Sequence, residues 1–180
     1  IFATAYSVNN ELVDYPVGPT PLFASKVRYE NYNWGYNELG DYFTNEFAGK
    51  APAITFDVRY KFLETLRDAS LAKADADGAM LYPAFVVTEG NFDHGAKLWV
   101  LDRLNIYHAW PIISGDTYHK DIAEQGSDYF KKVGFKNYYL VVSANSVLPA
   151  DLRPLTEKTE TVSIKNKRGD VAFNIYVGSL

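Results

Sequence analysis

Three histidines are the side chains of this 180-residue chain best suited to acid–base chemistry or zinc binding. They are His94, His108 and His119, and no two lie four residues apart, the spacing that brings two imidazoles to one face of a helix. His119 lies close to Asp121 and could form an acid–base pair, but its neighbours favour a solvated loop and a surface histidine. Since the chain has no cysteine, it offers no thiolate ligand, thiol nucleophile or disulfide. We therefore predict no metal site.

Two short segments imitate ligand-binding loops without meeting their requirements. A calcium loop beginning at Asp75 needs glycine at its sixth position and glutamate at its twelfth, where this chain has Met80 and Val86. The segment Gly90 to Lys97 is similar to a phosphate loop, but its lysine comes one residue late and no serine or threonine follows. We interpret the first as the end of a helix, stopped by Gly78, and the second as a turn.

The remaining motifs also favour structural interpretations. Arg168-Gly169-Asp170 spells the tripeptide known from integrin ligands, and we favour a hairpin turn in which Gly169 takes a positive φ. The chain contains no GxSxG elbow and no GxGxxG turn. We predict no catalytic residue, no cofactor and no enzymatic activity.

Composition places the chain among globular proteins. Apolar residues make up 47% and charged residues 22%, which excludes disordered and low-complexity classes. The net charge of -4 argues against a protein that grips nucleic acid, because such a protein needs a clustered positive surface. There is no apolar run long enough for a membrane helix and no leader-like start, so we expect no membrane partner.

The pattern along the chain predicts one mainly β domain over residues 1–180, an antiparallel barrel or sandwich with one packed helix at about 61–76. Prolines favour an extended arm over 1–22, and residues from about 143 to 180 are expected to form a C-terminal extension ending in a hairpin. Alternation in Ala53 to Tyr60 is typical of a half-buried strand, as are the runs at Lys26 to Tyr32, 80–87, 96–110 and 129–142. Periodicity predicts that Leu63 and Leu66 of the helix pack on the sheet.

Aromatic residues reach 16% of the chain and gather in a segment expected to be an irregular loop, Asn33 to Ala48, and just before it. Too many lie together, among asparagine and glutamate, for one inward face. We predict an interface with other copies of the chain, formed by the loop and the arm. Its candidate residues are Tyr29, Tyr32, Trp34, Tyr36, Tyr42 and Phe43.

The order of several segments resembles the tail-tube proteins of long-tailed bacteriophages and the related Hcp ring proteins of type VI secretion. The segments are Thr55-Phe56-Asp57-Val58, a helix after Arg59, strands to His108, Ala109-Trp110-Pro111-Ile112, and Lys132 to Tyr139, and together they cover about residues 50–142. The arm and the tail from Ser143 depart from the simplest tube proteins.

This resemblance implies a β-barrel with a flanking helix, assembled as hexameric rings that stack into a tube. It further implies a virion protein assembled in the host cytoplasm, with copies of itself and other tail or baseplate proteins as partners and DNA as passing cargo. The alternative is a secreted or surface β-sandwich that binds a glycan or apolar ligand through its exposed tyrosines and tryptophans.

Overall fold

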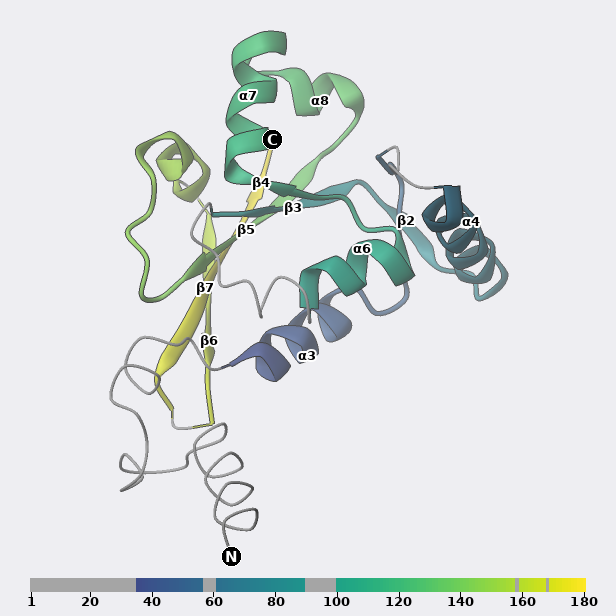
Figure 1. The fold of residues 1–180 in the computed structure, drawn as a ribbon, viewed down its shortest axis with the longest axis horizontal. Helices are drawn as coiled ribbons and strands as arrows, with labels where there is room; N and C mark the ends of the chain where they lie inside the picture. Colours follow the sequence, from purple (N-terminus) through teal and green to yellow (C-terminus); the bar gives the residue numbers. More distant parts are fainter. Residues whose placement is uncertain (1–34, 57–60, 90–99, 158, 168) are drawn as a thin grey trace, which may run out of the picture.

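The computed structural model describes residues 35–56, 61–89, 100–157, 159–167 and 169–180 (Figure 1). The predicted arm over 1–22 and the predicted strand from Lys26 to Tyr32 lie outside these residues. The helices are α3 (Tyr36–Glu46), α4 (Lys61–Ala76), α6 (Asp102–His108), α7 (Gly115–Gln125), α8 (Tyr129–Val133) and the 3-10 helix η2 (Ala150–Thr156). The strands are β1 (Lys50–Pro52), β2 (Met80–Tyr82), β3 (Ala84–Thr88), β4 (Ile112–Ser114), β5 (Asn137–Ser143), β6 (Glu160–Lys165) and β7 (Val171–Ser179).

Five of these strands form a mixed sheet in the order β4-β3-β5-β7-β6. Strands β4 and β5 run parallel to β3 on either side of it, with Val86 opposite both Ile112 and Tyr139. Strand β7 is antiparallel to β5 and to β6, so the C-terminal hairpin is part of the main sheet. The sheet is open at β4 and β6 in the described residues, so the predicted closed barrel is not formed.

The central strands are buried on both faces, and this explains their nearly continuous apolar sequence. All five residues of β3 are buried, and six of the seven in β5 are. Val86 and Tyr139 belong to the core on one face of the sheet, whereas Phe85 and Leu140 belong to the core on the other. The fold is therefore an α/β arrangement of layers, which matches the predicted β-rich domain with a packed helix only in part.

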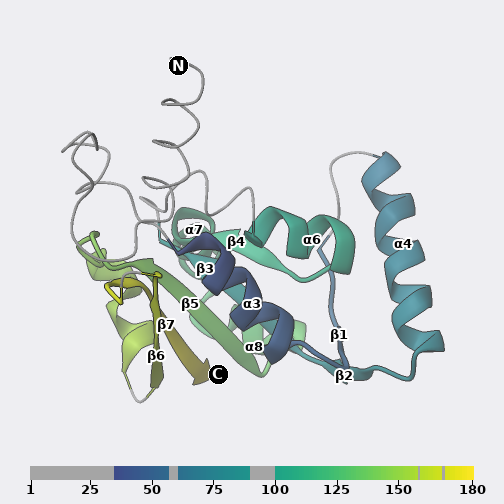
Figure 2. The ribbon, with the colours of Figure 1, turned by 90° about the horizontal axis from the view of Figure 1, so that it is seen from below.

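Helices cover both faces of the sheet (Figures 1 and 2). Helices α3 and α6 bury Leu39, Phe43 and Leu104 against one face, where Phe47 stacks on Trp110 with ring centroids 3.9 Å apart. On the other face α7, α8 and η2 contribute the buried residues Tyr118, Phe130, Leu152 and Leu155.

A smaller unit lies at one end of the molecule, where β1 and β2 pair in parallel and α4 lies between them in the chain. Helix α4 is the outermost element at that end in both views (Figures 1 and 2). It contacts α6 and β1, and none of its 16 residues is fully buried. The helix itself is confirmed with the predicted bounds, but its predicted packing on the main sheet is wrong, because Leu66 is 40% exposed.

Several other predicted elements are corrected. The aromatic segment expected to be an irregular loop contains α3, because Leu39 and Phe43 lie four residues apart on its inward face and the buried Phe47 follows at its end. Residues 53–56 form a bend and irregular chain instead of a strand, and 57–60 lie outside the described residues. Most of the described part of the strand predicted at 96–110 is α6, and α8 precedes β5 in the run at 129–142.

The C-terminal hairpin is confirmed. Strands β6 and β7 pair antiparallel, and Gly169 in the connecting turn has φ of 89°. Asn166 N–H bonds to the Asp170 carbonyl, and Gly169 N–H bonds to the Asn166 carbonyl, so the turn is closed by its own backbone. Within the described residues, no helix is both long and apolar enough to span a bilayer.

Candidate functional site

The described residues of the predicted interface belong to α3 and face the core. Phe43 is completely buried, and its ring packs edge-on against Tyr42 and Tyr139. Tyr36 and Tyr42 are partly buried against the same core. Tyr29, Tyr32 and Trp34 lie outside the described residues. A partner could therefore reach Phe43 only if α3 left the sheet.

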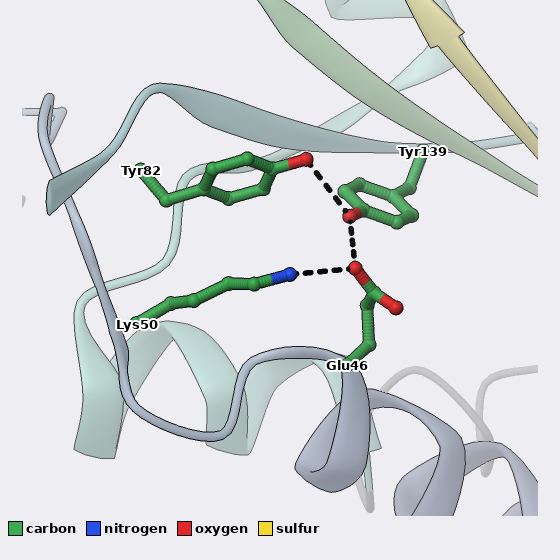
Figure 3. Close-up of polar contacts among 4 residues, drawn as sticks. All are labelled: Glu46, Lys50, Tyr82 and Tyr139. Carbon is green, nitrogen blue, oxygen red and sulfur yellow. Dashed lines mark hydrogen bonds and ion pairs between the residues drawn. The ribbon is translucent and has the colours of Figure 1, made fainter. Parts of the chain in front are cut away.

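A cluster of polar groups joins α3, the β1–β2 pair and β5 (Figure 3). Its members are Glu46, Lys50, Tyr82 and Tyr139, and we call them the polar cluster. Glu46 Oε1 accepts hydrogen bonds from Tyr139 Oη at 2.7 Å and from Lys50 Nζ at 2.8 Å. The two tyrosine hydroxyls are 3.2 Å apart. Since Tyr139 donates to Glu46, Tyr82 must donate to Tyr139.

The surroundings of the polar cluster favour a protonated Tyr139 and an ionised Glu46 through their pKa values. Burial raises the pKa of Tyr139, and its hydrogen bonds with Tyr82 and Glu46 raise it further. Burial also raises the pKa of Glu46, but hydrogen bonds from Lys50 and Tyr139 and the charge of Lys50 outweigh it, so the net pKa lies below the ordinary value. Burial, with the charges of Glu46 and Glu160, raises the pKa of the neighbouring Tyr42 to about 12.

These shifts favour a structural role for the polar cluster. A tyrosine that acts as a base or nucleophile near neutral pH needs a lowered pKa, and here the pKa values of Tyr139 and Tyr42 are raised. The ammonium of Lys50 is held by Glu46 and lies 4.6 Å from the centroid of the Tyr82 ring. The polar cluster fastens the β1–β2 pair to the main sheet.

A second group of polar residues lies where the parallel strands end. Apart from aromatic residues, the buried polar or charged residues of the described chain are Thr88, Glu89 and Ser143. Thr88 is the last residue of β3, Glu89 follows it, and Ser143 is the last residue of β5. Open α/β sheets commonly bind ligands at this edge. Here the start of α7 closes tightly over it, because a Cβ on Gly115 would lie 2.8 Å from Leu152 Cδ1 and 3.3 Å from the Thr88 carbonyl oxygen.

The residues that the sequence singles out for chemistry are separated in the structure. His119 lies on α7, with Nδ1 3.7 Å from Asp151 Oδ2, so an acidic side chain of η2 lies beside it and its surroundings are a helix rather than a loop. His108 ends α6, where burial and the charges of Lys73 and Arg103 lower its pKa. His94 and the segment from Gly90 to Lys97 lie outside the described residues. No three acidic or histidine side chains of the described chain are grouped so that they could hold a metal ion.

The segment that imitates a calcium loop forms the end of α4. Gly78 has φ of 70° and its N–H bonds to the Asp75 carbonyl. Ala79 N–H bonds to the Ala74 carbonyl, the six-residue closure of a Schellman motif. The interpretation of Gly78 as a helix stop is confirmed.

Exposed apolar side chains gather at the end of the molecule that carries α4. Eight large apolar residues of the described chain are exposed, and five of them lie on α4, β2 and α6. The five are Phe62 at 63%, Leu66 at 40%, Met80 at 60%, Leu81 at 69% and Tyr107 at 55%. Sequence reasoning missed this surface because it assigned Leu66 to the core. Single exposed apolar residues are ordinary on proteins, whereas a concentration at one end is typical of a contact surface.

The chain was compared with known proteins in three ways. No protein-family model matches it, and neither the curated proteins nor the solved structures contain a match. The fold, the two polar groups and the exposed apolar end described above are therefore the basis for any functional assignment.

Proposed function

We propose that this chain is a non-catalytic structural protein that assembles with copies of itself. The observation that carries the proposal is the concentration of exposed apolar side chains on α4, β2 and α6. Moving these groups from water into a contact is favourable by roughly 25 cal/mol for each Å² of apolar surface buried. The association surface is then the α4 end of the molecule and not the face of α3.

Two features of the polar groups support a role without catalysis. The most conspicuous titratable groups, those of the polar cluster, bond to one another, and the raised pKa of Tyr139 keeps that tyrosine protonated. Open α/β sheets commonly bind ligands at the carboxyl ends of their parallel strands. Here Gly115 at the start of α7 packs closely against Leu152 and the Thr88 carbonyl at that place. Both arrangements stabilise the fold. Neither accounts for the exposed apolar side chains on α4, β2 and α6.

The finer assignment, a phage tail-tube subunit in stacked hexameric rings around a DNA passage, stays a prediction. The resemblance implies a closed β-barrel, and the described strands form an open sheet, so the fold adds no support to it. The virion location and the tail and baseplate partners depend on that assignment. The alternative of a secreted or surface module that binds a glycan through tyrosines draws little support from α3, where Tyr36 and Tyr42 pack against the core.

Size-exclusion chromatography with light scattering tests the proposal. The purified chain should show a mass above that of one copy at concentrations in the micromolar range, with a larger share of assembled protein as concentration rises. Electron micrographs of the same sample test the finer assignment, which requires rings or tubes of constant width. A chain that stays monomeric at every concentration and salt level would refute self-assembly.

A further inference from the structure

Helix α4 presents an outer face without acidic residues. At 100° per residue, its partly buried side is the one that carries Leu63, Arg67 and Ser70, and Ser70 Oγ donates a hydrogen bond to the Tyr107 carbonyl of α6 at 2.6 Å. The neighbouring side is exposed along the whole helix. Its residues, which we call the outer face of α4, are Phe62, Thr65, Leu66, Ala69, Ala72, Lys73 and Ala76.

Large and small residues on the outer face are separated by position. Phe62 and Leu66 lie in the N-terminal half, whereas the alanines at 69, 72 and 76 occupy the middle and the C-terminal half. Alanine lets a second helix approach to about 8 Å, the short end of the usual interaxial range. A helix that packs here must therefore place small residues opposite Phe62 and Leu66, and large ones opposite Ala72 and Ala76.

A second α4 running in the opposite direction meets this requirement. A two-fold axis beside Ala69 sets Leu66 of each copy opposite Ala72 of the other, and Phe62 opposite Ala76. A parallel pair would instead set Phe62 against Phe62 and leave a gap between the alanines. We propose that two copies of this chain associate through an antiparallel pair of α4 helices centred on Ala69; this inference rests on the self-assembly proposed above.

Charge agrees with this arrangement. Helix α4 carries three basic and three acidic residues, so two copies do not repel one another through net charge. The antiparallel register brings Lys61 at the start of one helix near Asp75 and Asp77 at the end of the other. Opposed helix dipoles favour the same direction. Contacts of this kind are isologous, because the same face serves both copies.

The position and size of α4 determine how strongly two copies are expected to associate. Helix α4 lies at the periphery of the molecule with α6 on its inner side, so the main sheet does not stand between two such helices (Figures 1 and 2). A single helix pair falls at the small end of specific interfaces, below about 1,200 Å² in total. We therefore expect a dissociation constant in the micromolar range.

Disulfide formation tests the contact directly, because the chain contains no cysteine of its own. A disulfide needs Cα atoms within about 7 Å, and packed antiparallel helices bring the two copies of residue 69 within that limit. Under mild oxidation, Ala69→Cys should form covalent dimers at least about tenfold faster than Asp68→Cys. Asp68 is the matched control, since it is the preceding residue, its side chain is 63% exposed and it points about 100° away from Ala69.

Direction is tested with two further variants. In the proposed pair the two copies of residue 62 lie about 21 Å apart along the axis, so Phe62→Cys alone should not form a disulfide. A mixture of Phe62→Cys and Ala76→Cys should form mixed dimers. A rapid disulfide in Phe62→Cys alone would show a parallel pair and overturn the inference.

The outcomes separate the two proposals. Association of the wild-type chain without cross-linking of Ala69→Cys would overturn the α4 pair and leave self-assembly standing. A chain that remains monomeric would overturn both. Preferential cross-linking at residue 69, with mixed dimers from the pair at 62 and 76, is the result that we expect.

Discussion

Replacing Tyr139 by phenylalanine removes one oxygen from the centre of the polar cluster and leaves the ring in place. The lost hydroxyl donates to Glu46 at 2.7 Å and accepts from Tyr82 (Figure 3). A hydrogen bond to a charged group contributes about 1.5–3 kcal/mol to stability. The Glu46 side chain is 31% exposed, so water can replace part of the bond and the lower end applies. We expect the free energy of unfolding to fall by about 1.5–2 kcal/mol.

Acid should reveal the same bond. Because the folded-state pKa of Glu46 lies below its ordinary value, its contribution to stability is complete above the ordinary pKa and is lost as pH falls through the folded-state pKa. Tyr139→Phe removes one of the interactions that lower that pKa. The variant should therefore lose less stability than the wild type between neutral pH and about pH 3.

Chemical denaturation at several pH values measures both effects, and Tyr138→Phe is the matched control. Tyr138 is the preceding residue on the other face of β5, and its hydroxyl donates to the Leu155 carbonyl at 3.1 Å. Loss of that neutral bond should cost about 0.5–1.5 kcal/mol without changing the acid dependence. The reasoning is refuted if Tyr139→Phe loses less than about 0.5 kcal/mol, or if both variants respond to acid alike.

Three further predictions concern the packing of the fold, and each is measured by denaturant unfolding with circular dichroism. Leu140→Ala, in the fully buried part of β5, should cost about 2–5 kcal/mol, whereas Leu66→Ala on α4 should cost less than about 1 kcal/mol; equal losses would contradict the assigned burial. Gly178→Ala should cost about 1–3 kcal/mol, because the new Cβ would overlap the Tyr138 ring, and a neutral result would show that this ring moves aside easily. Gly169→Ala should cost about 1 kcal/mol, since its φ of 89° disfavours alanine although nothing crowds the site, and an unchanged midpoint would contradict that turn geometry.

Local patterns predicted the parts of the fold that depend on local physics. The helix over 61–76 follows from its apolar spacing and from Gly78, and the hairpin of β6 and β7 follows from two alternating runs around a glycine turn. The layers were mispredicted because β3 and β5 are buried on both faces. A continuous apolar run fits a strand in a parallel sheet as well as one in a barrel, and only the later pairing of β3 with β5 decides between them.

The helices α3 and α6 were not predicted. Aromatic residues favour strands, and the run that contains α6 was predicted as a strand. The α3 segment was predicted as an irregular loop, although Leu39 and Phe43 lie at helical spacing and pack against the sheet. The local pattern also could not predict which face of α4 is buried. Leu63 and Leu66 are both apolar and three residues apart, and only the position of α6 leaves Leu63 partly buried and Leu66 exposed.

Only part of the polar cluster could be predicted from the sequence. Glu46 and Lys50 are four residues apart, the spacing of an ion pair on a helix, and that signal was present. Tyr82 and Tyr139 come from strands far along the chain, so no spacing rule could have brought them to Glu46. The exposed apolar end likewise depends on how elements pack, because Met80 and Leu81 resemble any buried strand until their neighbours are placed.

Sedimentation velocity over a concentration series is the most direct test of self-assembly through α4, with Leu66→Asp and Val133→Asp as a matched pair. Leu66 and Val133 are 40% and 39% exposed, so neither aspartate should prevent folding, and circular dichroism checks this. We predict that the wild type and Val133→Asp associate with the same concentration dependence, whereas Leu66→Asp, which sets two carboxylates in an apolar contact, remains monomeric. Equal association of all three proteins would contradict assembly through α4, and a monomeric wild type would contradict self-assembly itself.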